Sequence, residues 1–355
     1  MNQKAKGRRQ KVKGKTEGES CVFTFSFYLL PFAFLQQSAL DPAGPHAARI
    51  GRLWWLMFYV SAGVFLVVSA TVLVAVFRRR RERNQASDEP DTSPDPQRER
   101  RMTRVVTGAL AVTAVILFVF LAGSFYTGRA LYSPADERAL SIKVTGHQWW
   151  WDVEYDAVPA SDTVRTANEI HVPVGRPVKL RLASADVIHS FWVPNLNGKK
   201  DLIPGHEIVL TFQADREGEF RGQCAEFCGY QHAHMAFKVI AETPAKFYEW
   251  MNQQRTPAPA PANEAEARGR DLFLKGPCVM CHTVRGTDAA GRVGPELTHL
   301  KSRTTIAAAT LPNTRGHLAG WVTNSQEIKP GNNMPPVPLA PEELQALLAY
   351  LESLK

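Results

Sequence analysis

Two long stretches without a charged side chain constrain this chain more than any other feature of its sequence. They run from Leu53 to Phe77 and from Val105 to Gly128. A helix of about 20 apolar residues crosses the hydrocarbon layer of a membrane, roughly 30 Å thick, with all its backbone hydrogen bonds satisfied internally. We therefore predict two transmembrane helices, at about 53–77 and 105–126, in a hairpin that spans residues 50–128.

Positive charge is concentrated beside these stretches. The formal net charge is +8. Residues 1–20 carry seven Lys/Arg and two Glu, and residues 78–104 carry nine Arg and six Asp/Glu, which accounts for all of it. Because arginines flank the connection between the two stretches, the positive-inside rule places that loop in the cytoplasm and everything after Arg129 outside. The remainder is balanced, so no basic face for a nucleic acid is expected.

The first 40 residues have the pattern of a secretory signal peptide. A basic segment precedes a short apolar run from Cys21 to Leu35, as in the n-region and h-region of such signals. We predict that residues 1–40 are a signal peptide. An uncleaved additional span and an over-extended start of the sequence are the alternatives.

Sulfur and nitrogen side chains gather in one short segment. Cys224 and Cys228 are separated by three residues, so both sulfurs can point at one centre in a tight loop. His232 and Met235 follow at spacings that let the returning chain close that centre. Thiolate, thioether and imidazole ligands together favour copper over hard cations. His189 is the expected remaining ligand; a disulfide and a structural zinc site are the alternatives.

The residues around this cluster have the pattern of β-structure. Short runs with alternating apolar side chains, separated by Gly, Pro, Asn and Asp, occur within residues 129–248. The predicted strands are 140–145, 149–155, 169–172, 178–182, 188–193, 208–212 and 235–240. Regularly spaced short strands favour a sandwich or barrel, and a Greek-key barrel would place the copper ligands between its last strands.

The complete motif resembles subunit II of cytochrome c oxidase, whose C-x-E-x-C-G-x-x-H-x-x-M pattern begins here at Cys224. The resemblance covers roughly residues 40–245 and implies a cupredoxin barrel with a binuclear copper centre, CuA. It implies that Glu226 binds copper through its backbone carbonyl and magnesium through its side chain. It also implies that Trp149 lies over the copper site and receives the electron. Asp201 is a weaker candidate for the polar region that meets the catalytic subunit.

A second cofactor motif follows a linker. Residues 252–263 contain alternating Pro and Ala, which favour an extended spacer, and we expect the domain beyond it, residues 264–355, to move on this linker. The sequence Cys278-Val-Met-Cys281-His282 is the pattern of covalent haem c, in which the cysteines bind the haem and the histidine binds its iron.

The surroundings of this motif resemble class I cytochromes c. Helices are predicted near residues 264–275 and 341–354. Pro295 stands where that family positions a proline against the proximal histidine, and Met334 stands where it has the second iron ligand. Ligation by His and Met raises the potential of haem iron, which suits an electron carrier. His299 and His317 are alternative second ligands.

The combination resembles the caa3-type oxidase, in which a cytochrome c domain is fused to the copper subunit. The implied fold is a two-helix transmembrane hairpin, then an all-β cupredoxin Greek-key barrel, then an all-α class I cytochrome c domain. The implied location is the bacterial cytoplasmic membrane, with a multi-pass anchor and with the CuA and haem c domains on the periplasmic face. The implied partners are subunit I, subunit III and, as donor, cytochrome c or a bc1-type complex.

The implied function is electron input to a haem-copper terminal oxidase that reduces O2 to water and pumps protons. Electrons would pass from the haem held by His282 and Met334, through the Trp149 region, to CuA. Neither apolar stretch contains a histidine, so the oxygen chemistry belongs to the partner subunit. The CuA subunit of a nitric oxide reductase is the first alternative, and a membrane-anchored copper chaperone is the second. The chain departs from the family in lacking a carboxylate between Arg100 and Thr127, where members usually carry a glutamate of a proton pathway.

Overall fold

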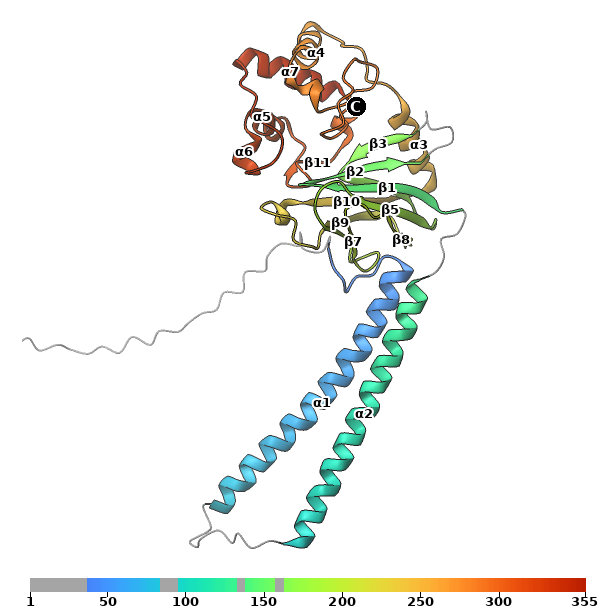
Figure 1. The fold of residues 1–355 in the computed structure, drawn as a ribbon, viewed down its shortest axis with the longest axis vertical. Coiled ribbons are helices and arrows are strands. Elements are labelled where there is room, and N and C mark those ends of the chain that lie inside the picture. The colour runs from blue at the N-terminus through green and yellow to red at the C-terminus, as the bar shows by residue number, and fades with distance from the viewer. Residues whose placement is uncertain (1–36, 84–94, 133–137, 157–162) are drawn as a thin grey trace, which may run out of the picture. The chain divides into compact units, whose positions relative to one another are not determined.

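The computed structural model describes residues 37–83, 95–132, 138–156 and 163–355 (Figure 1). Residues 1–36 of the predicted signal peptide lie outside the described residues. So do residues 84–94, in the middle of the predicted cytoplasmic loop.

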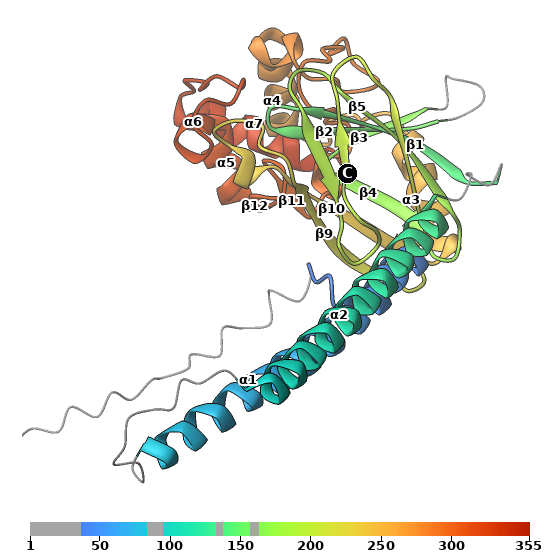
Figure 2. The same cartoon turned by 60° about the horizontal axis from the view of Figure 1, so that its bottom comes forward.

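Two long helices contain the apolar stretches. Helix α1 spans Pro45–Arg83 and α2 spans Pro96–Leu131. The Asp95 side chain accepts a hydrogen bond from the Gln97 amide and so caps α2, which begins with a proline. The helices run antiparallel and side by side (Figures 1 and 2), and Arg49 Nη1 of α1 donates to the Ala130 carbonyl of α2 over 2.8 Å.

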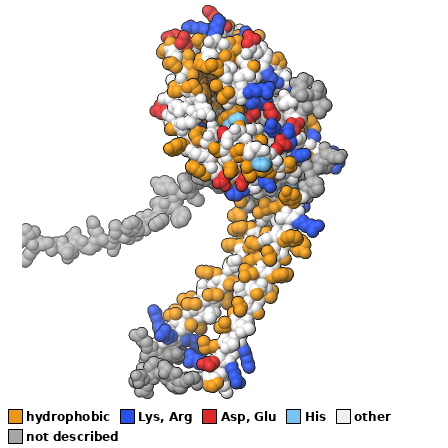
Figure 3. Space-filling view, in the orientation of Figure 1, with side chains coloured by type: hydrophobic (Ala, Val, Ile, Leu, Met, Phe, Trp, Pro, Cys, Tyr) orange, Lys and Arg blue, Asp and Glu red, His pale blue; other side chains and the backbone are white. Residues whose placement is uncertain are grey.

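Both helices are long and apolar enough to cross a membrane, and their most apolar windows are not buried within the described part of the chain. Figure 3 shows hydrophobic side chains along the helices and Lys and Arg side chains gathered near the ends that lead into the loop. This pattern agrees with the predicted hairpin and its basic connection.

In the described residues, the β part consists of two five-stranded sheets. The first has the order β3 (Val164–Ala167), β2 (Trp150–Tyr155), β1 (Leu140–His147), β5 (Val178–Ser184), β8 (Ile208–Phe212). The second has the order β4 (Glu169–Pro173), β10 (Ala236–Glu242), β9 (Gly218–Cys224), β6 (His189–Trp192), β7 (Lys200–Leu202). The β1–β5 and β4–β10 pairs are parallel and the other pairs are antiparallel. The predicted all-β fold is confirmed as a two-sheet sandwich.

Alternation along the strands fills the core of this sandwich. In β1 every second residue is buried, beginning with Leu140, because successive side chains of a strand point to opposite faces. The largest fully buried side chains of the β part are aromatic: Trp151, Tyr155, Phe191, Phe212, Phe237 and Phe247. Phe247 comes from α3 (Pro244–Arg255), which packs on the sandwich after its last strand.

Three described strands of the β part were not predicted from the sequence: β3, β7 and β9. Strand β9 contains Gly218 and Gly222, which read as turn residues. A Cβ at Gly222 would lie 2.2 Å from the ring of Phe237. Glycine is therefore needed here because the Phe237 ring approaches the backbone of the strand closely, and not because the chain turns.

The C-terminal part is helical. It contains α4 (Glu264–Lys275), α5 (Arg315–Thr323), α6 (Ser325–Ile328) and α7 (Pro341–Ser353), with a short ribbon of β11 (Thr305–Ile306) and β12 (Leu311–Pro312). Helices α4 and α7 pack closely, since a Cβ at Gly269 would lie 2.0 Å from the Ala346 carbonyl oxygen. Phe273, Leu347 and Tyr350 form the centre of its core.

The predicted linker is shorter and more restrained than its composition indicates. Helix α3 continues through residues 252–255. The Arg285 side chain of the helical part donates to the carbonyl oxygens of Gln254 and Thr256, and the Ala258 amide donates to the Arg285 carbonyl over 2.9 Å. The chain between the β and helical parts is therefore fastened to the helical part.

Candidate metal and haem sites

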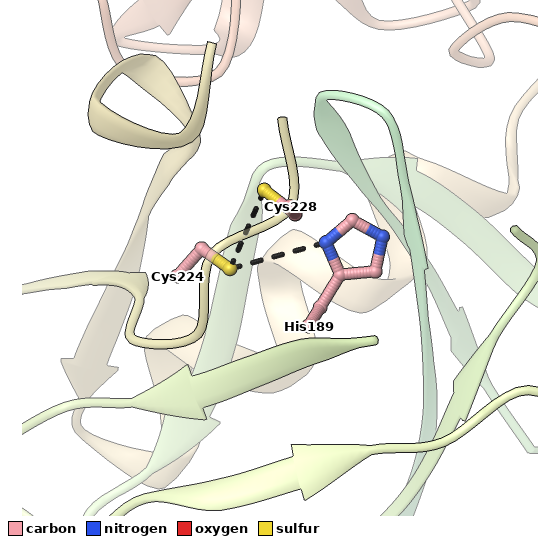
Figure 4. Close-up of side chains that lie close together, drawn as sticks. All are labelled: His189, Cys224 and Cys228. Carbon is pink, nitrogen blue, oxygen red and sulfur yellow. Dashed lines mark hydrogen bonds between the residues drawn. The ribbon is translucent and has the colours of Figure 1, made fainter. Parts of the chain in front are cut away.

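The predicted copper ligands converge at one end of the second sheet. Strand β6 supplies His189, strand β9 ends at Cys224, and these two strands are paired. Backbone hydrogen bonds hold the loop between Cys224 and Met235, because the Cys224 amide donates to the Met235 carbonyl over 2.9 Å. Figure 4 shows His189, Cys224 and Cys228 pointing toward one another.

The side-chain atoms of five predicted ligands lie within 4 Å of a neighbour in the set. The Cys224 and Cys228 sulfurs are 3.8 Å apart, and His189 Nδ1 is 3.9 Å from the Cys224 sulfur. The Cys228 sulfur is 3.6 Å from His232 Nδ1 and 3.8 Å from the Met235 sulfur. Both cysteines are free thiols. This donor set fits copper, because soft sulfur and imidazole ligands select it, and two thiolates with one imidazole beside each could hold a pair of copper ions.

The backbone carbonyl and the side chain of Glu226 face different surroundings. Its carbonyl oxygen lies 3.2 Å from the Cys224 sulfur, beside the ligand cluster. The residue itself is exposed, and its carboxylate accepts a hydrogen bond from the Phe227 amide. A carbonyl toward copper and a carboxylate toward solvent are compatible with the two roles that the resemblance implies for this residue.

Asp186 orients His189, and sequence reasoning missed it. Its Oδ1 lies 2.8 Å from His189 Nε2, which leaves Nδ1 facing the sulfur of Cys224. Burial raises the pKa of Asp186, but hydrogen bonds from His189, Val187 and Gln148 outweigh that effect and lower the pKa. A carboxylate behind a ligating histidine fixes its tautomer and orientation. The sequence feature that could have identified Asp186 is an acidic residue three positions before the histidine.

Trp149 packs on the copper-ligand loop. Its side chain is buried, and its indole Nε1 donates to the Cys228 carbonyl over 2.9 Å. Gly229 lies beneath it with φ 108°, where a Cβ would come within 3.1 Å of the Trp149 ring.

Asp201 is the weaker candidate for the polar region that meets the catalytic subunit. It lies exposed on strand β7.

The predicted haem ligands line one cavity in the helical part. Its walls include three residues of the haem motif, Cys278, Cys281 and His282, and the predicted second iron ligand, Met334, together with apolar core residues such as Leu318. His282 Nδ1 lies 2.7 Å from the Pro295 carbonyl oxygen, which leaves Nε2 free to bind iron. Burial lowers the pKa of His282 and so favours its neutral, ligating form. An apolar cavity with a pair of thiols and an oriented imidazole fits haem c.

The loop that carries Met334 is held in place by hydrogen bonds. The Met334 carbonyl accepts from Ser325 Oγ over 2.6 Å and from Gln326 Nε2 over 2.9 Å.

The two alternative iron ligands, His299 and His317, have other surroundings. His299 has a carbonyl oxygen at each ring nitrogen, from Lys355 and Thr256. His317 is exposed on α5.

The haem cavity extends to the β part. Gln148, Trp149 and Trp150 of the copper-binding sandwich belong to its walls. Lys329, which sequence reasoning also missed, lines it as well and is buried. No local pattern marks this lysine, because its contacts with the β part join residues far apart in the sequence.

Comparison with known proteins gives the family. Residues 157–242 match the family described as "Cytochrome C oxidase subunit II, periplasmic domain", and residues 266–355 match "Cytochrome c". Cytochrome c oxidase subunit 2 of Alkalihalophilus pseudofirmus is 35% identical over 325 residues, 90% of this chain and 91% of that protein. The Bacillus subtilis protein of the same name is 30% identical over 338 residues, 90% and 92% of the two chains. The chain therefore belongs to the cytochrome c oxidase subunit II family and carries a cytochrome c domain after its copper-binding domain.

Proposed function

We propose that this chain moves electrons from a haem in its helical part to a copper pair in its β part, and from there to the catalytic subunit of a haem-copper oxidase. When bound, the haem and the copper pair supply the redox chemistry, each taking up and giving up one electron. The observation that carries the proposal is the position of Trp149. It lines the haem cavity, and its indole hydrogen-bonds to the backbone of Cys228 in the copper-ligand loop.

In this proposal six residues hold copper. The side-chain ligands are His189, Cys224, Cys228, His232 and Met235, and the Glu226 carbonyl completes the set. The Glu226 carboxylate would hold magnesium, a cation that prefers oxygen ligands, where the domain faces the catalytic subunit. The buried positions of both cysteines and of His189 keep water from the metal site.

Four residues hold the haem. Cys278 and Cys281 would bind it covalently, and His282 and Met334 would ligate its iron. The Pro295 carbonyl keeps His282 in one orientation, and the hydrogen bonds at the Met334 carbonyl keep the opposite loop in place.

We infer the location and partners from the resemblance to the family. The two apolar helices anchor the chain in the membrane, and we place both cofactor domains on its outer face. Subunit I would receive the electron from copper, subunit III would complete the complex, and a cytochrome c or bc1-type complex would supply electrons. Because the relatives are named as cytochrome c oxidase subunits, we favour oxygen over nitric oxide as the final acceptor.

The substitution Trp149→Phe tests the proposed path. Phenylalanine keeps an aromatic ring but lacks the N–H that donates to Cys228, so electron transfer from haem to copper should slow while the optical spectra of both centres stay unchanged. The measurement is the rate of haem reoxidation after a light pulse in which an excited flavin reduces the haem.

The matched control is Trp150→Phe. Trp150 also lines the cavity, but it stacks on His147, with ring centroids 4.4 Å apart. Its substitution should leave the rate near that of the wild-type protein. A wild-type rate in Trp149→Phe would contradict the proposed path.

A further inference from the structure

The copper-binding and haem-binding parts share an interface of specific hydrogen bonds. Glu169 on β4 is buried, and its carboxylate accepts from the backbone amides of Thr304 and Thr305 in the helical part, over 2.8 and 3.2 Å. The Ala236 amide donates to the Ala308 carbonyl over 3.2 Å, and Gln231 Nε2 donates to the Pro330 carbonyl over 2.8 Å. These contacts do not support the expectation that the haem domain moves freely on its linker.

Lys329 makes the most buried polar contact of this interface. The residue comes directly after α6 in the chain, and only 2% of it is exposed. Its Nζ donates to the carbonyl oxygens of Trp149 and His234 in the β part, over 2.8 and 2.9 Å. The Ala307 carbonyl of the helical part lies 3.3 Å away as a third acceptor. An ammonium group has three N–H donors, so each of them has a partner.

Burying the ammonium group of Lys329 carries a free-energy cost that its hydrogen bonds must offset. Burial lowers the pKa of Lys329 to about 7, because an ammonium group loses its hydration in an apolar environment. Methionine or leucine would fill the same space without that loss. The three carbonyl oxygens offset the cost, and two of them belong to the other part of the chain.

The backbone that faces Lys329 is strained. Ala307, Ala308 and Ala309 all have a left-handed conformation, with φ of 55°, 58° and 55°, which costs free energy at every non-glycine residue. The strained turn presents the Ala307 carbonyl to Lys329 and the Ala308 carbonyl to the β part. The turn thus adopts an unfavourable conformation at the place where it meets the copper-binding sandwich.

We propose that Lys329 is a positioning residue that ties the Met334 loop of the haem site to the backbone of Trp149 and so fixes the separation of the two cofactors. The inference rests on the proposed function. Lys329 precedes Met334 by five positions, and the Asn332 side chain connects the two, donating to the Lys329 carbonyl over 2.7 Å and accepting from the Met334 amide over 2.8 Å. One short loop therefore holds a haem ligand at one end and the Trp149 backbone at the other.

The test is Lys329→Met in the full-length protein with both cofactors bound. Methionine keeps the apolar stem and removes every donor, and losing hydrogen bonds of a charged group shifts an equilibrium by about tenfold or more. We expect haem-to-copper transfer to slow by at least about tenfold and to become dependent on solvent viscosity, because the haem part must dock again before each transfer. The haem and copper spectra should not change.

Two further variants and one further measurement keep the test decisive. Lys329→Arg retains charge and donors and should retain more of the rate than Lys329→Met. Lys275→Met removes an exposed lysine that pairs with Asp271 on α4 and should have no effect. Pulsed electron paramagnetic resonance on the oxidised protein should show a narrow distribution of iron-to-copper distances in the wild-type protein and a broad one in Lys329→Met.

Failure of the proposed function and failure of the role of Lys329 would be seen in different measurements. If the wild-type protein transferred no electron from haem to copper, the proposed function would be wrong, and the distance distributions would still decide the role of Lys329. A wild-type rate without viscosity dependence, together with a narrow distance distribution in Lys329→Met, would overturn the inference.

Discussion

The copper-binding and haem-binding parts of this chain prepare their sites in different ways. In the β part, fully buried aromatic side chains such as Trp151 and Phe237 fill the core, and the copper ligands are held at its end by backbone hydrogen bonds. In the helical part, Leu318, Val322 and Leu351 belong both to the hydrophobic core and to the wall of the haem cavity. The haem would therefore be part of the core it binds to, whereas copper would bind between Cys224, Cys228 and Met235 at the end of a core that aromatic side chains already fill.

Because of this difference, we expect the two parts to depend unequally on their cofactors for stability. Packed apolar side chains stabilise a fold through the surface that they remove from water, and the β part has many of them around a metal site of few atoms. The helical part has a smaller hydrophobic core, and the large apolar haem would pack against that core. Loss of haem should thus affect folding, and loss of copper should affect mainly electron transfer.

The largest effect is expected from replacing both haem-attachment cysteines, Cys278→Ala with Cys281→Ala. Without covalent haem the helical part should lose its cooperative unfolding transition, since a tightly held group stabilises a fold by about 4 kcal/mol or more. Calorimetry and limited proteolysis check this, and the copper signal of the β part should persist. An unchanged unfolding temperature of the helical part would show that this part does not need haem for its stability and would contradict the expected difference between the two parts.

A smaller effect, confined to copper binding, is expected for Asp186→Asn. The amide cannot hold His189 as a carboxylate does, so the affinity for copper should fall by about 10- to 100-fold while the unfolding temperature of the β part changes little. Copper competition with a chelator measures the affinity. Asp201→Asn, an exposed position on β7, is the matched control, and equal effects of the two substitutions would contradict the role of Asp186.

The smallest effect is expected for Glu352→Gln on the surface of the helical part. Burial raises the pKa of Glu352, but contacts with Lys301 and Arg315 outweigh it and lower the pKa. A carboxyl with a lowered pKa stabilises the fold above its ordinary pKa of 4.5, and that contribution is lost as the pH falls below it. At neutral pH the substitution should cost less than about 1 kcal/mol, and the difference should vanish in acid. A pH-independent loss in thermal unfolding would refute this.

The sequence predicted those parts of the molecule that depend on local pattern. Charge-free runs gave the two helices, and motifs with fixed spacing gave residues that the structure brings together around Cys228 and His282. Residues whose role depends on distant contacts escaped prediction. Lys329 meets Trp149 across 180 positions, and the need for glycine at position 222 arises because the Phe237 ring fills the space where a side chain would lie.

Whether the chain carries both redox centres can be measured as the metal content of the purified full-length chain, produced in cells that attach haem c, together with electron paramagnetic resonance of its oxidised form. We expect two copper ions and one iron per chain, with a signal from one unpaired electron shared between the coppers. A single isolated copper, or zinc beside an intact disulfide of Cys224 and Cys228, would contradict it.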